Sequence, residues 1–266
     1  MENKEITKNC ISMVNDMLEK VKTMDETEYQ KFLDGINLFH DYSWLNRVIL
    51  YCHGATNVKG FRQWNAINRS VKRGEKAIWI IAPKLKKVKK EVEVQGKKEV
   101  TEKSTLYGFM AVPVFDLAQT EGDPLPEKNL TTQVENIKIE SLIKIAEELN
   151  FNVSFQEMSY SKGGYIDTEN NIVLNSILSE RENIGTLIHE ISHGLLKHNG
   201  NVDLSREFKE QEAETMSYLI NSRIGISRES RFYLKTWGVS ETIKTSMSKI
   251  EKAMEVFFEC FEDVYN

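Results

Sequence analysis

The chain has 266 residues, of which 40% are hydrophobic and 28% are charged. Because it contains no run of about 18 apolar residues and its first segment is charged and amphipathic, we expect neither a transmembrane span nor a secretory signal, and therefore a globular cytoplasmic protein. The 3 cysteines are scattered without a C-x-x-C pair, which argues against a disulfide framework or a zinc site built from cysteine.

The net charge of −5 conceals an asymmetry between the two halves of the chain. Residues 1–120 carry 20 basic and 15 acidic side chains, whereas residues 121–266 carry 15 and 25. The window 59–90 alone holds eleven basic side chains and one acid, Glu75. We therefore expect the two halves to face different partners.

Helices come first along the chain. Apolar residues recur at helical spacing in 4–22 and 26–40, the run WLNRVILYC continues as a third helix, and FRQWNAINR predicts a short fourth. The β-branched and aromatic runs AIWIIAP and LYGFMAVPVF then predict buried strands. Between these runs valines alternate with charges around Gln95 and Gly96, which is typical of an exposed basic hairpin.

Prolines, a glycine and polar residues interrupt the periodicity at QTEGDPLPEKNLTTQ, residues 119–133. We place the domain limits there: a first domain at 1–126, a linker at 127–135 and a second domain at 136–266.

The second half begins with the predicted helix IESLIKIAEELN and three short strands, FNVSFQE, GGYID and NIVLN. The next helix, SERENIGTLIHEISHGLLKH, carries Ser179 and Glu182 at the spacing of a capping box. Further helices are expected at 206–223, near Phe232 and at 241–261. Because each half combines strands with helices in separate runs, we predict an α+β fold with two domains.

The segment TLIHEISHGLLKH carries His189, Glu190 and His193 in the pattern H-E-x-x-H. Residues four apart on a helix lie on one face, so both imidazoles can bind one ion. Glu190 lies about 100° round the helix, where its carboxylate can accept a proton from water. His198 could be a ligand by its spacing, but a position on the surface or behind a ligand is the stronger interpretation.

A catalytic zinc site usually needs a third protein ligand. On the following helix FKEQEAETMSYLI places Glu210 and Glu214 four residues apart, and we assign Glu210 as the third ligand. Glu214, one turn later, would accept the free ring N–H of a ligand histidine. Glu212 is expected to point elsewhere. The alternative is that two histidines and a glutamate-rich helix occur together by chance, but their order after three strands favours a metal site.

We therefore expect one Zn²⁺ per chain, with Mn²⁺ or another divalent ion as the alternative. Amide hydrolysis with Glu190 as the base is the natural reaction of such a site. The segment GGYIDTENNIVLN offers a strand edge that could hold an extended peptide, and either Tyr165 or His198 could stabilise the oxyanion.

Over about residues 136–226 the chain resembles the ImmA/IrrE class of gluzincin-like metallopeptidases. Four segments carry the resemblance, in this order: GGYI, NIVLN, TLIHEISHGLLKH and EQEAE. In that class the pattern E-x-x-A-[NDE] follows the H-E-x-x-H helix, and the resemblance implies that its first glutamate, here Glu210, is a ligand. Glu214 departs from the family pattern, which often has Asn or Asp at this position.

The first half carries features of a nucleic-acid interface. Basic side chains in a loop can neutralise phosphates, aromatic rings can stack on bases, and hydroxyl and amide groups can hydrogen-bond. Trp79 is expected in the core, and Trp64 is as readily buried as exposed. The candidate DNA-binding residues are Tyr42, Ser43, Asn46, Trp64, Arg69, Lys72, Arg73 and Lys76.

Over most of residues 25–126 the chain resembles the N-terminal module of ArdC-type antirestriction proteins. Three segments carry the resemblance: LFHDYSWLNRVILYC, GFRQWNAINRSVKRGEKAIWIIAP and VPVFDLAQTEGDPLP. The resemblance implies single-stranded DNA as a partner, and an antirestriction role for a mobile genetic element that enters a cell as a single strand. Two alternatives stay open: a regulatory protease that cleaves a repressor or restriction component, and a non-enzymatic DNA shield with a structural metal.

Overall fold

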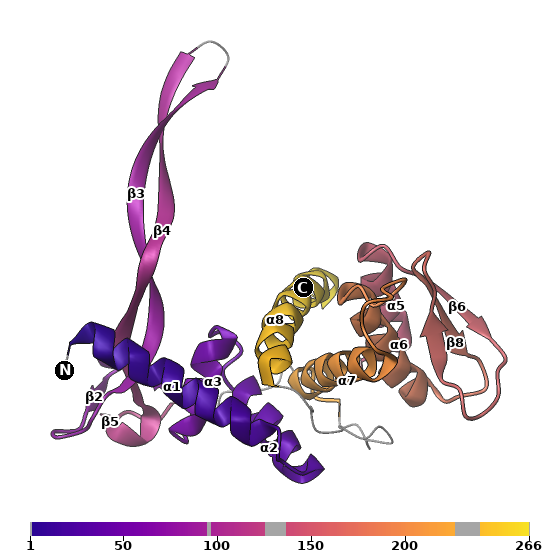
Figure 1. The fold of residues 1–266 in the computed structure, drawn as a ribbon, viewed down its shortest axis with the longest axis horizontal. Helices are drawn as coiled ribbons and strands as arrows, with labels where there is room; N and C mark the ends of the chain where they lie inside the picture. The colour runs from indigo at the N-terminus through magenta and orange to yellow at the C-terminus, as the bar shows by residue number, and fades with distance from the viewer. Residues whose placement is uncertain (1, 95–96, 126–136, 227–239, 266) are drawn as a thin grey trace. The chain divides into compact units, whose positions relative to one another are not determined.

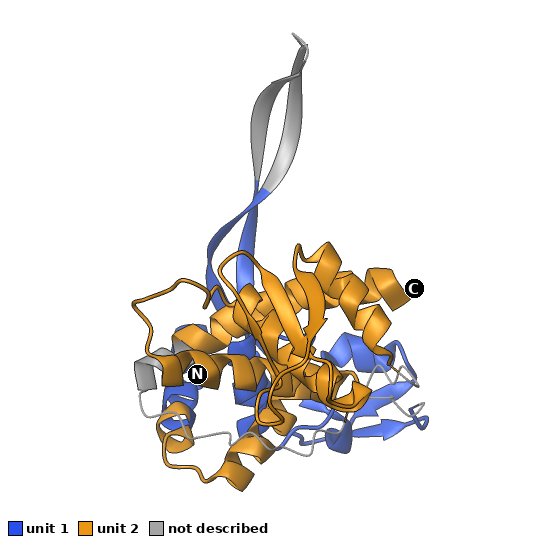
Figure 2. Ribbon diagram, turned by 90° about the vertical axis from the view of Figure 1, so that its right-hand side faces the viewer, with its two compact units in different colours: residues 1–17, 39–126 blue, residues 18–38, 127–266 orange. Residues whose placement is uncertain are grey.

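The computed structural model divides into two compact units (Figure 2). The first unit contains residues 1–17 and 39–126, and the second contains residues 18–38 and 127–266. The described residues are 2–94, 97–125, 137–226 and 240–265, and their side chains are described except at 88–103 and 240–244. The predicted linker at 127–135 and the helix expected near Phe232 lie outside the described residues.

Helices α1 and α3 supply most of the helical residues of the first unit, although residues 18–21 at the end of α1 belong to the second. Helix α1 (Asn3–Val21) is joined to the strands through Asn3, whose Nδ2 donates to the carbonyl oxygen of Ala111 at 2.8 Å and whose Oδ1 accepts from the Ala111 amide at 3.1 Å. Helix α3 (Trp44–Cys52) buries Val48, Ile49 and Leu50 completely. Its predicted bounds are confirmed.

A long antiparallel hairpin dominates the first unit, formed by β3 (Ile78–Val94) and β4 (Lys97–Asp116), with a register shift between Lys84 and Leu85 (Figure 1). The basic hairpin expected from the sequence is therefore continuous with the two apolar runs. The short elements around it are β1 (Val58–Lys59), which pairs with β4, the helix α4 (Phe61–Asn65), and β2 (Arg69–Val71), which pairs with β5 (Thr120–Gly122).

The expectation that both apolar runs are buried holds only at the base of the hairpin. Ile78, Ile80 and Val114 are buried there. Further along the ribbon Leu106 and Phe109 are 52% and 58% exposed. The reason is that this part of the ribbon is two-stranded, and no described element of the first unit covers it.

The turn that follows β4 is held by Asp116. Its carboxylate accepts hydrogen bonds from the backbone amides of Thr56, Asn57 and Ala118 at 2.7, 2.9 and 3.1 Å. Because the side chain is buried and fully engaged, Asp116 has the structural role that its place at the strand end predicts.

The second unit contains a three-stranded sheet in the order β6-β8-β7. Strand β6 runs parallel to β8, and β7 pairs antiparallel with the other side of β8, so β7 forms one edge of this sheet. Helix α6 packs on the sheet and on α7. The bounds are β6 (Asn152–Gln156), β7 (Gly164–Ile166), β8 (Asn171–Asn175), α5 (Ile139–Glu148), α6 (Glu180–Leu195), α7 (Arg206–Arg223) and α8 (Ser240–Tyr265).

Helix α6 begins as its sequence predicts. Ser179 accepts from the amide of Glu182, and the Glu182 carboxylate accepts from the Ser179 amide at 3.1 Å, which completes the capping box. The apolar face formed by Ile184, Ile188 and Ile191 is buried. This face holds the helix against the unit's core and so fixes the direction of the polar side chains beside it.

Helix α2 (Glu26–Asn37) packs on α7 and therefore belongs to the second unit. The hydroxyls of Tyr29 and Thr215 lie 3.3 Å apart, and Asn37 Nδ2 donates to the carbonyl oxygen of Leu219 at 3.2 Å. A cut in the predicted linker would separate α2 from the helix that it contacts.

Both units combine helices with small sheets, which confirms the predicted α+β class. Among the described residues, no helix is long and apolar enough to cross a membrane.

Candidate functional site

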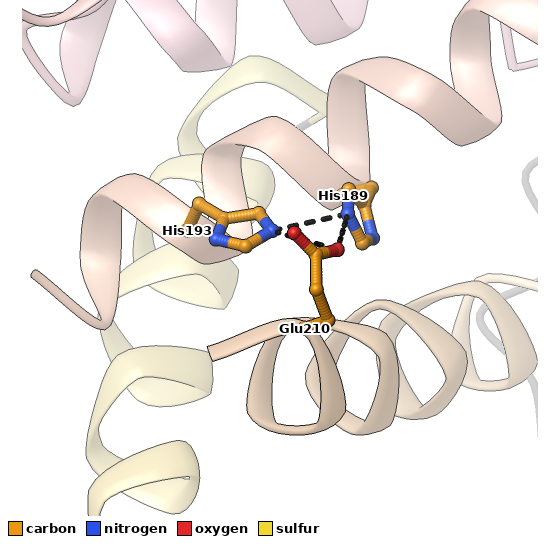
Figure 3. A group of neighbouring side chains, drawn as sticks. All are labelled: His189, His193 and Glu210. Carbon is orange, nitrogen blue, oxygen red and sulfur yellow. Dashed lines mark hydrogen bonds and ion pairs between the residues drawn. The ribbon is translucent and has the colours of Figure 1, made fainter. Parts of the chain in front are cut away.

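Two neighbouring helices bring three donor groups of the second unit together (Figure 3). His189 and His193 lie one turn apart on α6, and their Nε2 atoms are 3.1 Å from each other. From α7 the carboxylate of Glu210 reaches between them, with Oε2 at 3.5 Å from His189 Nε2 and 3.6 Å from His193 Nε2. The structure thus brings together the three residues predicted as metal ligands.

The three donors fit a metal ion by distance. An ion with tetrahedral coordination and bonds of about 2.0–2.2 Å needs donor atoms about 3.3–3.6 Å apart. The two distances to the Glu210 oxygen, 3.5 and 3.6 Å, lie in this range, and the 3.1 Å between the two imidazole nitrogens is about 0.2 Å shorter. Two imidazole lone pairs so close also repel each other unless a proton or a cation lies between them. His189, His193 and Glu210 could therefore hold one divalent ion.

The surroundings of His189 favour its charged state when no metal is present. Its Nδ1 lies 2.9 Å from Oε2 of Glu214, so Glu214 takes the position behind the histidine that its spacing predicts. Burial lowers the pKa of His189, but the contacts with Glu210 and Glu214 outweigh burial and raise the pKa to about 9. Hydrogen bonds from the two histidines hold the pKa of Glu210 far below its usual range.

Glu190 lies beside the three donors without joining them. Its side chain is buried, and its carboxylate accepts a hydrogen bond from the backbone amide of Ile166 on β7. Burial raises the pKa of Glu190, against the opposing charges of the two histidines. A carboxylate that is partly desolvated and near a metal site has the properties of a general base.

A cavity of about 1100 Å³ opens over this site. Its lining includes Glu190 and the edge strand residues Gly164 and Tyr165. Tyr165 is 36% exposed, and the ammonium of Lys162 lies over its ring at 4.3 Å from the centroid. An extended chain placed in this cavity would therefore meet the edge of a sheet and the candidate base together.

Two glycines allow close packing around helix α6, Gly194 against Phe151 and Gly164 of β7 against Thr186. A Cβ atom on Gly194 would lie 2.4 Å from Cε1 of Phe151, and a Cβ atom on Gly164 would lie 2.7 Å from the carbonyl oxygen of Val173 and 2.9 Å from Cγ2 of Thr186. Both positions therefore require glycine for the observed packing.

Glu212 does not join the three donor groups, in keeping with the expectation that it points elsewhere on the helix. It is nevertheless only 1% exposed, and its Oε2 lies 2.9 Å from His198 Nε2. Burial raises the pKa of Glu212, but hydrogen bonds from His198, Ser246 and Lys249 outweigh burial and lower it. The side chain is enclosed because α7 lies between α6 and α8, so a second face of α7 is also covered.

His198 is also buried, at 3% exposure, so its placement on the surface is excluded, and it lies behind the candidate ligand His193. Its Nδ1 lies 3.0 Å from Nδ1 of His193. Burial lowers the pKa of His198. With both ring nitrogens facing protein groups, His198 has no atom free to stabilise an oxyanion.

In the first unit several predicted DNA-binding side chains are engaged internally. Asn46 pairs with the backbone of Ile81 through two hydrogen bonds of 2.8 Å. Trp64 is 0% exposed, and its Nε1 donates to the carbonyl oxygen of Phe115 at 2.9 Å. The Tyr42 hydroxyl donates to the carbonyl oxygen of Val58 at 3.1 Å. The indole of Trp64 therefore cannot stack on a base in this structure, because its ring completes the core.

The predicted basic loop is divided between structural and exposed charges. Arg69 is partly buried and ties β2 to β5, with Nε donating to Oγ1 of Thr120 at 2.9 Å. Lys72 Nζ donates to the carbonyl oxygen of Ala118 at 2.9 Å but stays exposed. Arg73 and Lys76 are exposed, as is Ser43 before α3.

The hairpin exposes aromatic residues that the sequence did not single out. Tyr107 and Phe109 are 65% and 58% exposed, and Lys86 and Lys87 on the paired strand are exposed as well. Both aromatic residues lie in an apolar run that predicts a buried strand, which is why they were missed. The sequence already places these aromatic residues in the run that pairs with the lysine-rich strand, and this pairing was the signal that could have identified them.

Comparison with known proteins assigns both halves of the chain. Residues 2–115 match the family model of the N-terminal domain of anti-restriction factor ArdC. Residues 146–257 match the model of the IrrE N-terminal-like domain, Peptidase_M78. The chain joins an ArdC-type domain to an IrrE-like domain. Both resemblances inferred from the sequence motifs are thereby confirmed.

Two solved structures are similar to this chain in fold. The metal-free crystal structure of the antirestriction protein ArdC from plasmid R388 matches this ArdC-like chain with a TM-score of 0.52 at 18% identity, covering 82% of this chain and 85% of that one. Its Mn(II)-bound structure matches with a TM-score of 0.50 at 19% identity, covering 81% and 83%. Among curated proteins no significant match was found.

Proposed function

We propose that this chain is an antirestriction protein that binds single-stranded DNA through its ArdC-type domain and hydrolyses peptide bonds at a zinc site in its IrrE-like domain. The convergence of His189, His193 and Glu210 within bonding distance of one ion carries the enzymatic part of the proposal. The two family matches support the combination of activities.

Zinc is the proposed ion because two imidazoles and one carboxylate suit its tetrahedral preference. The R388 relative has been crystallised with Mn(II), which supports a divalent ion and keeps manganese as the alternative. Held by these three residues, such an ion would act as a Lewis acid and lower the pKa of water.

The chain's own residues would supply the remaining parts of the reaction. Glu190, buried and bonded to the Ile166 amide, would accept the proton from the attacking water and pass it to the leaving amine. Strand β7 would align an extended peptide by main-chain hydrogen bonds along the edge that faces away from β8. Tyr165, half-exposed in the same cavity, is the proposed hydroxyl for the oxyanion.

Exposed basic and aromatic side chains of the first unit support DNA binding. Lys72, Arg73 and Lys76 can neutralise phosphates, and the exposed rings of Tyr107 and Phe109 can stack on unpaired bases. Both contacts are independent of sequence, so the proposed partner is single-stranded DNA without strong sequence preference.

The variant Glu190→Gln tests the enzymatic part, with Glu207→Gln on α7 as a matched control. We expect about one zinc per chain in both variants, because neither residue is a proposed ligand. Cleavage of a proteome-derived peptide library, followed by mass spectrometry, should fall about 10²- to 10⁴-fold in Glu190→Gln alone. Retained cleavage would remove Glu190 from the mechanism.

The same variant separates the rival functions. If transfer of a mobile element into a restricting host stays protected by Glu190→Gln while cleavage is lost, the chain is a DNA shield whose metal is structural. If protection is lost together with cleavage, proteolysis of a repressor or restriction component is part of the function.

A further inference from the structure

The two histidines of the proposed metal site are supported in different ways. Behind His189 lies a carboxylate, because Nδ1 is 2.9 Å from Oε2 of Glu214. Behind His193 lies another imidazole, because Nδ1 is 3.0 Å from Nδ1 of His198. His198 in turn meets a carboxylate, with Nε2 at 2.9 Å from Oε2 of Glu212. The second histidine therefore reaches its carboxylate through an intervening ring.

The turn after α6 places this intervening ring. Lys197 adopts a left-handed conformation with φ of 55°, and the His198 amide then donates to the carbonyl oxygen of His193 at 3.0 Å. The chain is thus folded back so that the His198 ring faces the His193 ring, with centroids 5.0 Å apart. Their proximity follows from the backbone and not from helical spacing.

Only one placement of protons satisfies every contact in this series. His193 must present the lone pair of Nε2 to the ion, so its proton is on Nδ1 and is donated to Nδ1 of His198. The proton of His198 is then on Nε2 and is donated to Glu212. A carboxylate can only accept when it is ionised, so Glu212 ends the series and fixes its direction.

Glu212 is itself held in place from a third element. Lys249 on α8 lies with Nζ at 3.0 Å from Glu212 Oε2, and Ser246 on the same helix also bonds to this carboxylate. The side chain of Glu212 is 1% exposed, so a buried negative charge is compensated by partners from the α6–α7 loop and from α8.

We propose that His198 and Glu212 are positioning residues that fix the tautomer and ring orientation of His193, and thereby set the metal affinity of the site. The proposal rests on the proposed metal site and extends it to the α6–α7 loop and to α8. Partners behind a ligand histidine commonly change metal affinity about 10- to 100-fold, and we expect an effect of this size here.

The test uses the full-length protein and competition for zinc with a chromophoric chelator. His198→Phe keeps a ring of similar volume but removes the acceptor for His193 Nδ1, and we expect zinc affinity to fall about 10- to 100-fold. Glu212→Gln keeps the shape and an acceptor oxygen but removes the charge, so a smaller loss is expected. Lys252→Met, at an exposed lysine on the same helix that has no part in this series of contacts, serves as the control.

A second readout separates positioning from general stability. In nitrogen-15 spectra of histidine, zinc-bound wild type should show His193 with its proton on Nδ1, and His198 with its proton on Nε2. Unchanged zinc affinity in a folded His198→Phe variant would overturn the proposal. If His198→Phe does not fold, unchanged affinity in Glu212→Gln would overturn it equally. A wild-type protein that binds no zinc would instead overturn the metal site itself.

Discussion

The candidate metal site and the candidate DNA-binding loop were predicted with similar reasoning, yet the structure treats them differently. At the metal site, His189, His193 and Glu210 all converge. In the first unit, Asn46 and Trp64 are bonded inside the fold. The difference teaches that a spacing rule on a helix constrains where side chains point, whereas basic and aromatic composition in short elements does not.

The largest expected effect is the loss of bound zinc when a proposed ligand is replaced, and its absence would contradict the contrast between the two sites. We expect His189→Ala to lose stoichiometric zinc, because two donors remain where the ion needs three, and Glu210→Ala to retain a small fraction of it. Elemental analysis of the purified proteins measures both. Glu207→Ala, an exposed glutamate on the same helix, is the matched control and should keep about one zinc per chain.

If Glu210→Ala kept full occupancy, another carboxylate would have to complete the site. Glu214 is the nearest alternative, since its carboxylate already contacts the back of His189. His198 could not replace it without breaking its contact with Glu212.

The exposed basic side chains of the first unit test whether the predicted loop binds DNA. Replacing Lys72, Arg73 and Lys76 by alanine should weaken single-stranded DNA binding and reduce the slope of log affinity against log salt by about 2, since each phosphate contact on a single strand contributes about 0.7. Fluorescence anisotropy at several salt concentrations measures both quantities. Replacing Lys4, Lys8 and Lys20 removes the same charge from the exposed side of α1 and is the control.

An unaltered slope in the first triple variant would mean that phosphates are bound elsewhere. The lysines of the hairpin, Lys86 and Lys87, would then be the next set to replace.

Exposed and buried aromatic residues of the first unit should differ in their effect on DNA binding. The double change Tyr107→Ala and Phe109→Ala is expected to weaken single-strand affinity about tenfold or more, because one stacked base contributes about 1–3 kcal/mol. Trp64→Phe should leave affinity unchanged while lowering the free energy of unfolding by about 1 kcal/mol, because it removes the bond to Phe115. Anisotropy and urea unfolding measure the two effects. The reverse pattern would mean that the core position of Trp64 is not kept on DNA.

The last expected effect follows a change of conditions and not of sequence, because metal affinity should depend on pH. In the absence of metal the pKa of His189 is raised to about 9, so near pH 7 the ring carries a proton that the ion must displace. Apparent zinc affinity should therefore rise up to about tenfold per pH unit from about pH 7 toward 9, and level off above. Chelator competition between about pH 6.5 and 8 measures the slope. A flat profile would show that His189 is already neutral.

Local rules predicted most of the fold. The capping box of Ser179 and Glu182 and the apolar spacing of Ile184, Ile188 and Ile191 are visible within one helix, so α6 and its histidines followed directly. Predicting Glu210 as a ligand required the assumption that two helices pack side by side. Because Glu210 lies on the helix that directly follows α6, this assumption was a simple one.

The parts that the sequence left open depend on contacts distant in sequence or on backbone geometry. His198 reaches His193 only because Lys197 turns the chain through a left-handed conformation, and Glu212 is enclosed only because α8 returns to cover it. Trp64 lies in the short helix α4, where five residues give no periodicity that could reveal a buried face.

The close approach of β7 to α6 has a consequence for what the proposed enzyme would cut. At Gly164 a missing methyl group lets the strand lie against Thr186 of the helix. An alanine there would push the strand away from the helix, whereas His189, His193 and Glu210 are held by α6 and α7. A substitution at Gly164 would therefore change how a peptide lies over Glu190 without touching the residues that hold the ion.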